Sequence, residues 1–184
     1  MRCFGDGDAL YERYHDQEWG RPRTSEQALY EKVCLEGFQA GLSWITVLRK
    51  RDALREAFAG FDPEAVAELD PEPLLTDVRL IRSGPKMRAC VRNARATIAL
   101  RAEGGLAALV WSYRTDLPAP ATWSAVPATT GGSTELATRL KRAGFAFVGP
   151  TTVYSLLQAC GPVDDHLVAC PVRAAVEDER AAVG

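Results

Sequence analysis

Apolar residues in this chain recur at the spacing of an α-helix. The clearest repeat consists of Met87, Val91, Ala94 and Ile98, with Arg88, Arg92 and Arg95 on the opposite side. Further helices are predicted over residues 24–41, 43–58, 133–143 and 151–160. No segment alternates convincingly between apolar and polar residues, which is the pattern of a half-exposed strand. The sequence therefore predicts an all-α fold.

Several helix ends are marked by capping residues. Thr24 and Gln27 have the spacing of a capping box, with Thr24 as the N-cap. Asp62 and Asp70 each precede a Pro-Glu pair, so each predicts a short helix with proline at its first position. The remaining predicted boundaries are a tight turn at Ser83-Gly84-Pro85, a helix end at Gly104-Gly105, a long loop over residues 115–132 and a frayed tail after Pro171.

Size and composition are those of an ordinary globular protein. The 184 residues, 47% of them hydrophobic, predict one domain over residues 1–184, in two helical lobes, with a core that needs no disulfides. No run of about 20 apolar residues is present to span a membrane, and residues 1–16 lack the apolar segment of a signal peptide. We therefore expect a cytoplasmic protein without membrane contact.

The cysteines and histidines suggest a metal site. Five cysteines are an odd number, which favours free thiols or metal ligands over a disulfide framework. Three are expected in the core: Cys34, Cys90 and Cys160. The other two lie near the only two histidines, in the pairs Cys3–His15 and His166–Cys170. Such a set suits a structural zinc ion that joins the ends of the chain, although spacing alone slightly favours two buried thiols and two surface imidazoles.

Charge is unevenly distributed in a chain whose net charge is −2. Residues 62–77 hold six acidic residues and no basic one, whereas residues 79–101 hold seven basic residues and no acidic one. Within the basic segment, the helix that follows Ser83-Gly84 is expected to present free N–H groups beside Lys86 and Arg88. This arrangement suits a DNA phosphate, but charge alone favours an ordinary solvated helix face.

One acidic residue lies on an apolar helix face. Glu36 follows Leu29 by seven positions and Val33 by three, so its carboxylate shares their buried stripe. A buried carboxylate without a partner is costly, and we expect water and nearby tyrosines to satisfy it. Four aromatic residues lie nearby in sequence: Tyr11, Tyr14, Trp19 and Trp44. Together with Glu36 they suggest a pocket for a flat, electron-poor ring, although each ring alone is better explained as core.

Four segments in order resemble the DNA-3-methyladenine glycosylase I family. They are YHDQEWG at 14–20, CLEGFQAGLSWITVLRKR at 34–51, RNARA at 92–96 and GFAFVGPTTVYSLLQACGPVDDH at 144–166. The resemblance extends over residues 3–170, and the second and fourth segments are long and specific. It implies an all-α fold of the helix-hairpin-helix glycosylase superfamily.

The family resemblance also implies an activity. It implies hydrolysis of the N-glycosidic bond of 3-methyladenine in double-stranded alkylated DNA, as a step of base excision repair, with the free base as product. The methylated base is cationic and leaves as a neutral molecule, so little general acid catalysis is needed. No lysine is obviously placed as a Schiff-base nucleophile, and a monofunctional, monomeric enzyme without lyase activity is expected.

The resemblance assigns roles to individual residues. Glu36 is implied as the catalytic residue that contacts the base. The other implied base-binding residues are Tyr14 and Trp44, which stack on the base, and Tyr11 and Trp19, which line the pocket. The implied DNA-binding residues are Gly41 and Leu42 as a wedge, with Ser83, Gly84, Lys86 and Arg88 on the backbone. The implied ligands of a structural zinc ion are Cys3, His15, His166 and Cys170.

The chain departs from the family pattern at two places. The family usually has Gly-Trp directly after the first zinc cysteine, and that tryptophan adds to the base pocket. Here Phe4-Gly5 follows Cys3, and the interval to His15 is one residue shorter. The hairpin has the sequence LIRSGPK, where the family commonly ends in Arg-Gly-Lys. Two other functions therefore stay open: a zinc-stapled DNA-damage binding protein with altered or lost activity, and a helical protein with an incidental basic helix.

Overall fold

The structure is a computed structural model that describes residues 1–183. This part of the chain contains nine α-helices, four short 3-10 helices and no strand, as the helical spacing predicts. The first half comprises α1 (Ala9–Gln17), α2 (Glu26–Gln39), α3 (Trp44–Ala57), η1 (Ala59–Phe61), α4 (Pro63–Ala67) and η2 (Glu72–Thr76). The second half comprises α5 (Gly84–Leu100), η3 (Arg101–Glu103), α6 (Gly105–Trp111), η4 (Trp123–Ala125), α7 (Gly131–Arg142), α8 (Pro150–Cys160) and α9 (Arg173–Ala181).

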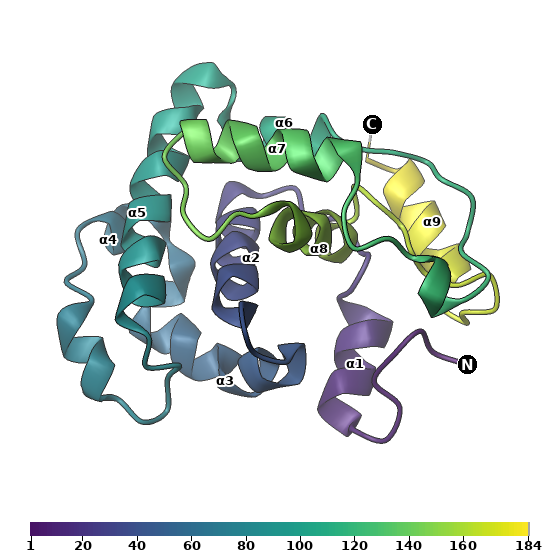
Figure 1. Ribbon diagram of the computed structural model, residues 1–184, viewed down its shortest axis with the longest axis horizontal. Coiled ribbons are helices and arrows are strands. Elements are labelled where there is room, and N and C mark those ends of the chain that lie inside the picture. Colours follow the sequence, from purple (N-terminus) through teal and green to yellow (C-terminus); the bar gives the residue numbers. More distant parts are fainter. Residues whose placement is uncertain (184) are drawn as a thin grey trace.

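Helix α2 forms the centre of the molecule (Figure 1). It packs against α3, α5, α6 and α8, with α4 and α5 on one side and α1, α9 and both termini on the other. Because neighbours surround it, every residue from Val33 to Phe38 is buried, Glu36 included. The Tyr30 hydroxyl donates a hydrogen bond of 2.8 Å to the Cys90 carbonyl on α5. The predicted two-lobed domain stays a prediction.

Helix α2 starts one residue later than predicted. Ser25, not Thr24, is the N-cap, and its hydroxyl accepts a hydrogen bond from the amide of Ala28. The Gln27 side chain does not turn back to the cap, because its amide donates to the carbonyl of Gly60 at 2.9 Å. A tertiary contact with η1 thus replaces the predicted capping box.

The prolines start helices, with two differences from prediction. Asp62 caps α4 as predicted, but the segment after Asp70 forms only the 3-10 helix η2, in which Pro73 has no N–H to donate. Gly84 is not a turn residue, because it lies inside the first turn of α5 with Ser83 as N-cap. Pro85 has a φ suited to that first turn, which extends the helix back to Gly84.

The C-terminal segment is a helix rather than the predicted frayed tail. Arg180 on α9 is buried, and its guanidinium donates to the carbonyls of Gly161, Thr115 and Pro162. Val176 is also fully buried. These contacts anchor α9 against the rest of the chain, whereas its sequence alone is too polar to reveal them.

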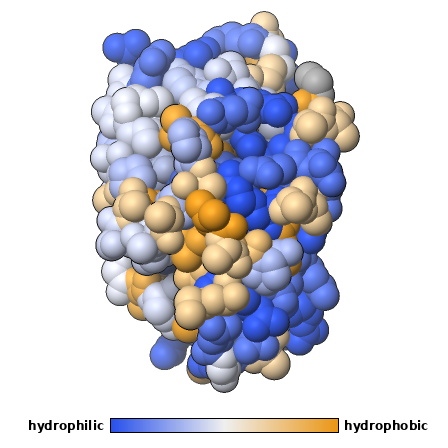
Figure 2. All heavy atoms as spheres, turned by 90° about the vertical axis from the view of Figure 1, so that its right-hand side faces the viewer, coloured by the Kyte–Doolittle hydropathy of each residue, from blue (hydrophilic) through white to orange (hydrophobic). Residues whose placement is uncertain are grey.

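Other predictions about the chain are confirmed. Met87, Val91 and Ala94 of α5 are buried, and Ile98 is half-buried. Helix α5 ends at Leu100, before the predicted glycines: η3 follows it, Gly104 is the C-cap of η3 with a left-handed φ of 99°, and Gly105 is the first residue of α6. The loop before α7 is long and contains only η4. Cys34, Cys90 and Cys160 are buried free thiols. No helix in residues 1–183 is long and apolar enough to cross a membrane. The face of the molecule that carries both termini shows an apolar patch among hydrophilic residues (Figure 2).

Candidate active site and metal centre

A pocket of about 230 Å³ is lined by residues of α1, α2, α3 and α8. It contains all five residues that the sequence suggested for a base pocket: Tyr11, Tyr14, Trp19, Glu36 and Trp44. Sequence reasoning missed further lining residues, namely Gln39, Trp123, Ser155 and Gln158. Phe4 also lines the pocket. It directly follows Cys3, where the family usually has Gly-Trp. The predicted residues therefore come together although they belong to different elements.

The walls of the pocket are aromatic. The rings of Tyr14 and Trp44 have centroids 5.2 Å apart and are tilted by 44°. Phe4 packs edge-on against Trp19, with 5.0 Å between centroids, and lies 5.0 Å from Tyr11. Tyr14, Trp19 and Trp44 are buried in the core, so their rings are held in place before any ligand arrives.

Glu36 has a partner that the sequence analysis did not foresee. The carboxylate is only 4% exposed, and its Oε1 lies 3.0 Å from the Nζ of Lys32, one turn earlier on α2. The expected tyrosines do not hydrogen-bond to it; instead Lys32 donates to the Tyr14 hydroxyl at 2.7 Å. The i, i+4 spacing of Lys32 and Glu36 was the available signal.

Lys32 lies behind the aromatic wall rather than in the pocket. Its Nζ is 3.6 Å from the Trp44 ring centroid, and it lines a separate, smaller cavity of about 40 Å³ with Arg51 and Glu18. Burial and the Glu36 carboxylate raise the pKa of Tyr14 well above its ordinary value. The Tyr14 phenol is therefore protonated at neutral pH. The Lys32 ammonium contacts the Glu36 carboxylate and lies over the rings of both Tyr14 and Trp44.

The predicted wedge turn connects α2 to α3. Gly41 has a φ of 77°, a left-handed value that favours glycine, and the Leu42 amide donates to the Gln39 carbonyl at 2.7 Å. The Leu42 side chain is 41% exposed, unusual for a large apolar residue. The turn therefore presents an apolar side chain beside the mouth of the pocket, since Gln39 lines that pocket.

The predicted backbone-binding residues are engaged within the protein. Lys86 donates to the carbonyls of Phe38 and Ala40 at 2.8 and 2.5 Å, where it supports the end of α2 and the wedge turn. Burial lowers its pKa. Arg88 pairs with Glu72 at 2.6 Å, and Ser83 and Gly84 form the start of α5. Contacts of these residues with DNA stay predictions.

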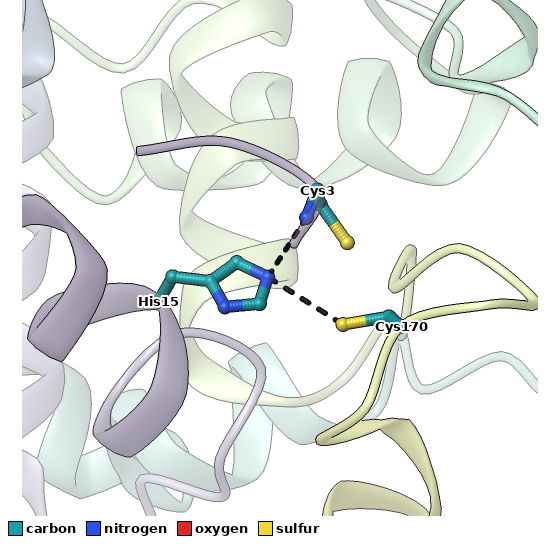
Figure 3. Close-up of side chains that lie close together, drawn as sticks. All are labelled: Cys3, His15 and Cys170. Carbon is teal, nitrogen blue, oxygen red and sulfur yellow. Dashed lines mark hydrogen bonds between the residues drawn. The ribbon is translucent and has the colours of Figure 1, made fainter. Parts of the chain in front are cut away.

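Three of the four predicted metal ligands form one cluster (Figure 3). The ligand atoms of Cys3, His15 and Cys170 all lie within 4.8 Å of one another, and the His15 Nε2 is 3.6 Å from the Cys170 Sγ. His166 is not part of this group, but its ring centroid is 5.2 Å from that of His15. The structure thus brings segments from both ends of the chain to one place.

The surroundings of both histidines fit a metal centre. The Nδ1 atoms of His15 and His166 each lie 2.8 Å from a carboxylate, of Asp16 and Asp164 respectively. This is the arrangement that orients a metal-binding imidazole and leaves Nε2 for the ion. The His166 Nε2 is buried and has no hydrogen-bond partner among residues 1–183. A buried nitrogen without a hydrogen-bond partner is costly. The His166 Nε2 is therefore suited to bind an ion that the protein chain itself does not supply.

Protonation states are consistent with this centre. Hydrogen bonds from Arg2, and a smaller one from His15, lower the pKa of Asp16 to about 2, so it remains an anion beside the imidazole. Burial lowers the pKa of His15, which keeps it in the neutral form that binds metals. Burial raises the pKa of the Cys3 thiol to about 12, and metal binding would displace its proton.

Residues 4–174 match the family model of methyladenine glycosylases. The chain belongs to this family. This methyladenine glycosylase family member is 46% identical to DNA-3-methyladenine glycosylase 1 of Escherichia coli (strain K12), over 89% of this chain and 91% of that protein. It is 44% identical to DNA-3-methyladenine glycosylase of Haemophilus influenzae, over 94% of this chain and 97% of that protein.

Solved structures of methyladenine glycosylases have the same fold as this family member. A crystal structure of 3-methyladenine DNA glycosylase I superimposes with a TM-score of 0.90, at 44% identity, over 93% of this chain and 98% of that one. The enzyme of Staphylococcus aureus, whose structure addresses 3-methyladenine recognition, gives 0.88 at 36% identity, over 93% and 95% of the two chains. The family match over residues 4–174 includes every residue that lines the pocket, together with His15 and Cys170 of the cysteine–histidine cluster.

Proposed function

We propose that this protein is a monofunctional DNA glycosylase of base excision repair. Its substrate is 3-methyladenine in double-stranded alkylated DNA, and it hydrolyses the N-glycosidic bond to release the base. The observation that carries the proposal is the buried Glu36 carboxylate in an aromatic pocket. The relatives of this chain, which are named DNA-3-methyladenine glycosylases, support it. The segment around Ser83-Gly84-Pro85-Lys86 then belongs to a helix-hairpin-helix, and the protein acts as a cytoplasmic monomer.

Base recognition follows from charge and shape. N3-methylation makes adenine cationic, and a carboxylate in a water-poor site attracts that ring more strongly than neutral adenine. Glu36 accepts a hydrogen bond from the exocyclic amine, while Tyr14 and Trp44 stack on the ring and Tyr11 and Trp19 line the walls. Support comes from the position of Tyr14 and Trp44, which both line the pocket together with Glu36 and have ring centroids 5.2 Å apart.

The chemical step needs little help from an acid. The cationic base withdraws electrons from the glycosidic bond and departs as a neutral molecule, and water takes its place on the sugar. No lysine is among the residues that line the pocket within residues 1–183, so a Schiff base has no nucleophile there. We therefore propose hydrolysis without strand cleavage.

Binding of the base competes with an existing ion pair. Glu36 is already paired with Lys32 at 3.0 Å, so the cationic base must share or displace that ammonium. Lys32 approaches from behind the Tyr14–Trp44 wall, and the open side of the carboxylate faces the pocket. We propose that Lys32 remains paired with the Glu36 carboxylate between turnovers.

DNA is proposed to bind beside the mouth of the pocket. The Gly41–Leu42 turn wedges into the gap that the flipped base leaves, and exposed Leu42 is suited to that role. Ser83, Gly84 and Arg88 at the start of α5 hold the phosphate backbone. Lys86 acts at the same place, through its hydrogen bonds to the turn and by its proposed contact with a phosphate.

A structural zinc ion is proposed to join the two ends of the chain. Cys3, His15, His166 and Cys170 would hold it, which gives a closed, four-coordinate set with no site for water. Support comes from the three-residue cluster and the unpartnered His166 nitrogen. When bound, the ion supplies folding energy rather than catalytic chemistry.

The deciding experiment is base release from methylated DNA. Wild type and Glu36→Gln are incubated with N-methylated duplex DNA, and the released bases are separated and identified. Wild type should release 3-methyladenine, and Glu36→Gln should be slower by on the order of 100-fold, because a charge that acts only on the cationic base is lost. DNA binding without release by wild type would contradict the proposal and indicate a damage-binding protein.

A further inference from the structure

Trp123 is a large aromatic residue at an unusual position. It is 46% exposed, yet it lines the same pocket as Glu36. Its ring centroid lies 5.8 Å from that of Phe4 and 6.1 Å from that of Trp19. It comes from η4, in the long loop between α6 and α7, which lies beside the N-terminal segment and α9 (Figure 1). A pocket-lining ring with so much exposed surface has area available for a ligand.

The loop around Trp123 is fixed at several points. On its N-terminal side the Pro120 carbonyl accepts a hydrogen bond of 3.1 Å from the Val168 amide. On its C-terminal side Val126 packs against the core, and its amide donates to the Trp123 carbonyl at 3.1 Å. The indole is therefore held at the rim of the pocket by contacts on both sides, and is not at the tip of a free loop.

Trp123 differs from Tyr14, Trp19 and Trp44 in its place in the fold and in its exposure. Tyr14 and Trp44 come from α1 and α3, and Trp19 follows α1, and all three are buried. Trp123 is the one indole in the pocket that remains largely exposed in the described structure. A planar base between these rings would cover that exposed face, and each such stacking contact strengthens nucleobase binding considerably.

We propose that Trp123 is the outer wall of the base pocket and stacks on the flipped base once it has entered. This inference rests on the proposed function and adds a base-contacting residue from a loop to the residues of α1, α2 and α3. Because the contact forms only with a base in the pocket, Trp123 contributes to base affinity and not to binding of DNA that lacks a base.

The test uses the full-length, metal-loaded protein and three variants. Trp123→Ala removes the ring, Trp123→Phe keeps an aromatic face, and Leu117→Ala is a matched control for an exposed apolar residue of the same loop that does not line the pocket. Affinity for free 3-methyladenine is measured by calorimetry, base release by single-turnover kinetics, and Tm by thermal unfolding. Affinity for duplex DNA with an abasic site is the fourth measurement.

We expect Trp123→Ala to bind free 3-methyladenine about tenfold more weakly, with a comparable loss in base release. Trp123→Phe should recover most of the affinity, and Leu117→Ala should match wild type. Affinity for abasic DNA should not change, because the contact of Trp123 forms only with a base in the pocket. Tm should not change either, because the exposed ring fills no cavity. These results would support the inference.

Three results would overturn it. One is a Trp123→Ala protein that binds 3-methyladenine as tightly as wild type does. Another is an equal loss of affinity for abasic DNA, which would make Trp123 a DNA contact. A third is a lowered Tm that Trp123→Phe does not restore, which would make its role structural. In each case wild-type base release would leave the proposed function intact, whereas a wild type that releases no 3-methyladenine would contradict both.

Discussion

Glu36 and His166 are two buried polar side chains that differ in how the protein satisfies them. The Glu36 carboxylate is paired with Lys32 at 3.0 Å, inside a single helix. His166 is held by Asp164 through Nδ1 at 2.8 Å, but its buried Nε2 has no partner among residues 1–183. Both groups would be costly to bury alone, yet only one of them is complete within the chain.

The difference fits a site that binds a base transiently and a second site that the proposed zinc ion would occupy permanently. A substrate leaves after each turnover, so the acid that recognises it must be stable in the empty protein, and Lys32 provides that stability. A structural ion stays, so the centre at the chain ends can depend on it. Stability should therefore respond strongly to loss of the ion and only moderately to changes around Glu36.

The largest expected effect is loss of the metal centre. Removing the ion by chelation, or replacing a ligand by Cys170→Ala, should lower the free energy of unfolding by about 4 kcal/mol. Segments from both ends of the chain meet at this cluster, so its loss releases them together. Denaturant unfolding measures the loss in the free energy of unfolding, and elemental analysis measures the zinc content.

Cys34→Ala is the matched control, since Cys34 is a buried thiol on α2 outside the cluster. This variant should retain one zinc ion per chain, whereas Cys170→Ala should retain little. A Cys170→Ala protein with a full equivalent of zinc would show that the ion binds elsewhere. His166→Ala tests the fourth position in the same way, because wild-type zinc content in this variant would exclude His166 as a ligand.

The positions of the helices and of the pocket residues could be predicted from local pattern. Periodicity marked α2 and α5, and it placed Glu36 among buried residues. Three of the rings that line the pocket, those of Tyr14, Trp19 and Trp44, lie within segments that resemble the family, so their proximity in space followed from that resemblance. These features depend on short-range spacing, which a sequence displays directly.

Features set by long-range contacts could not be predicted. Helix α9 is held by Arg180 hydrogen bonds to carbonyls far away in the chain, and its sequence gives no sign of them. Trp123 reaches the pocket from a loop without periodicity. Lys32 had the right spacing to pair with Glu36. The sequence does not show, however, in which direction the long lysine side chain extends from α2, or that its amine can be buried against Trp44.

A moderate effect is expected when the partner of Glu36 is removed. Lys32→Met leaves a buried carboxylate without a cation, and we expect a loss of about 2 kcal/mol in the free energy of unfolding. The double variant Lys32→Met/Glu36→Gln should lose less than the two single variants together, because each single variant leaves one unpaired buried charge and the double variant leaves none. Denaturant unfolding of all four proteins gives the coupling free energy directly.

Lys141→Met is the control for this cycle, because Lys141 is an exposed lysine on α7. Its effect should stay within about 0.5 kcal/mol. Strict additivity of the Lys32 and Glu36 changes would mean that the ion pair contributes no net coupling. Glu36 would then resemble His166 in depending on a group from outside the protein, and the contrast between the two sites would disappear.

The smallest expected effect concerns a second ion pair behind the aromatic wall. Glu18 lies in the same small cavity as Lys32 and accepts hydrogen bonds from Arg51 at 2.6 and 2.9 Å. Burial alone would raise the pKa of Glu18, but the hydrogen bonds and charge of Arg51 outweigh it and lower the pKa below its ordinary value of 4.5. A carboxyl group whose pKa is lower in the folded than in the unfolded state stabilises the fold at pH values above the unfolded pKa. This contribution disappears as the pH falls through the folded pKa.

Glu18→Gln should therefore cost about 1 kcal/mol at neutral pH, and the difference from wild type should shrink as pH falls below 4.5. Denaturant unfolding between neutral and acid pH measures that difference, with Glu68→Gln, an exposed acid on the surface, as the variant that should follow wild type throughout. A Glu18→Gln penalty that stays constant with pH would mean that the Glu18 side chain acts by packing rather than by charge.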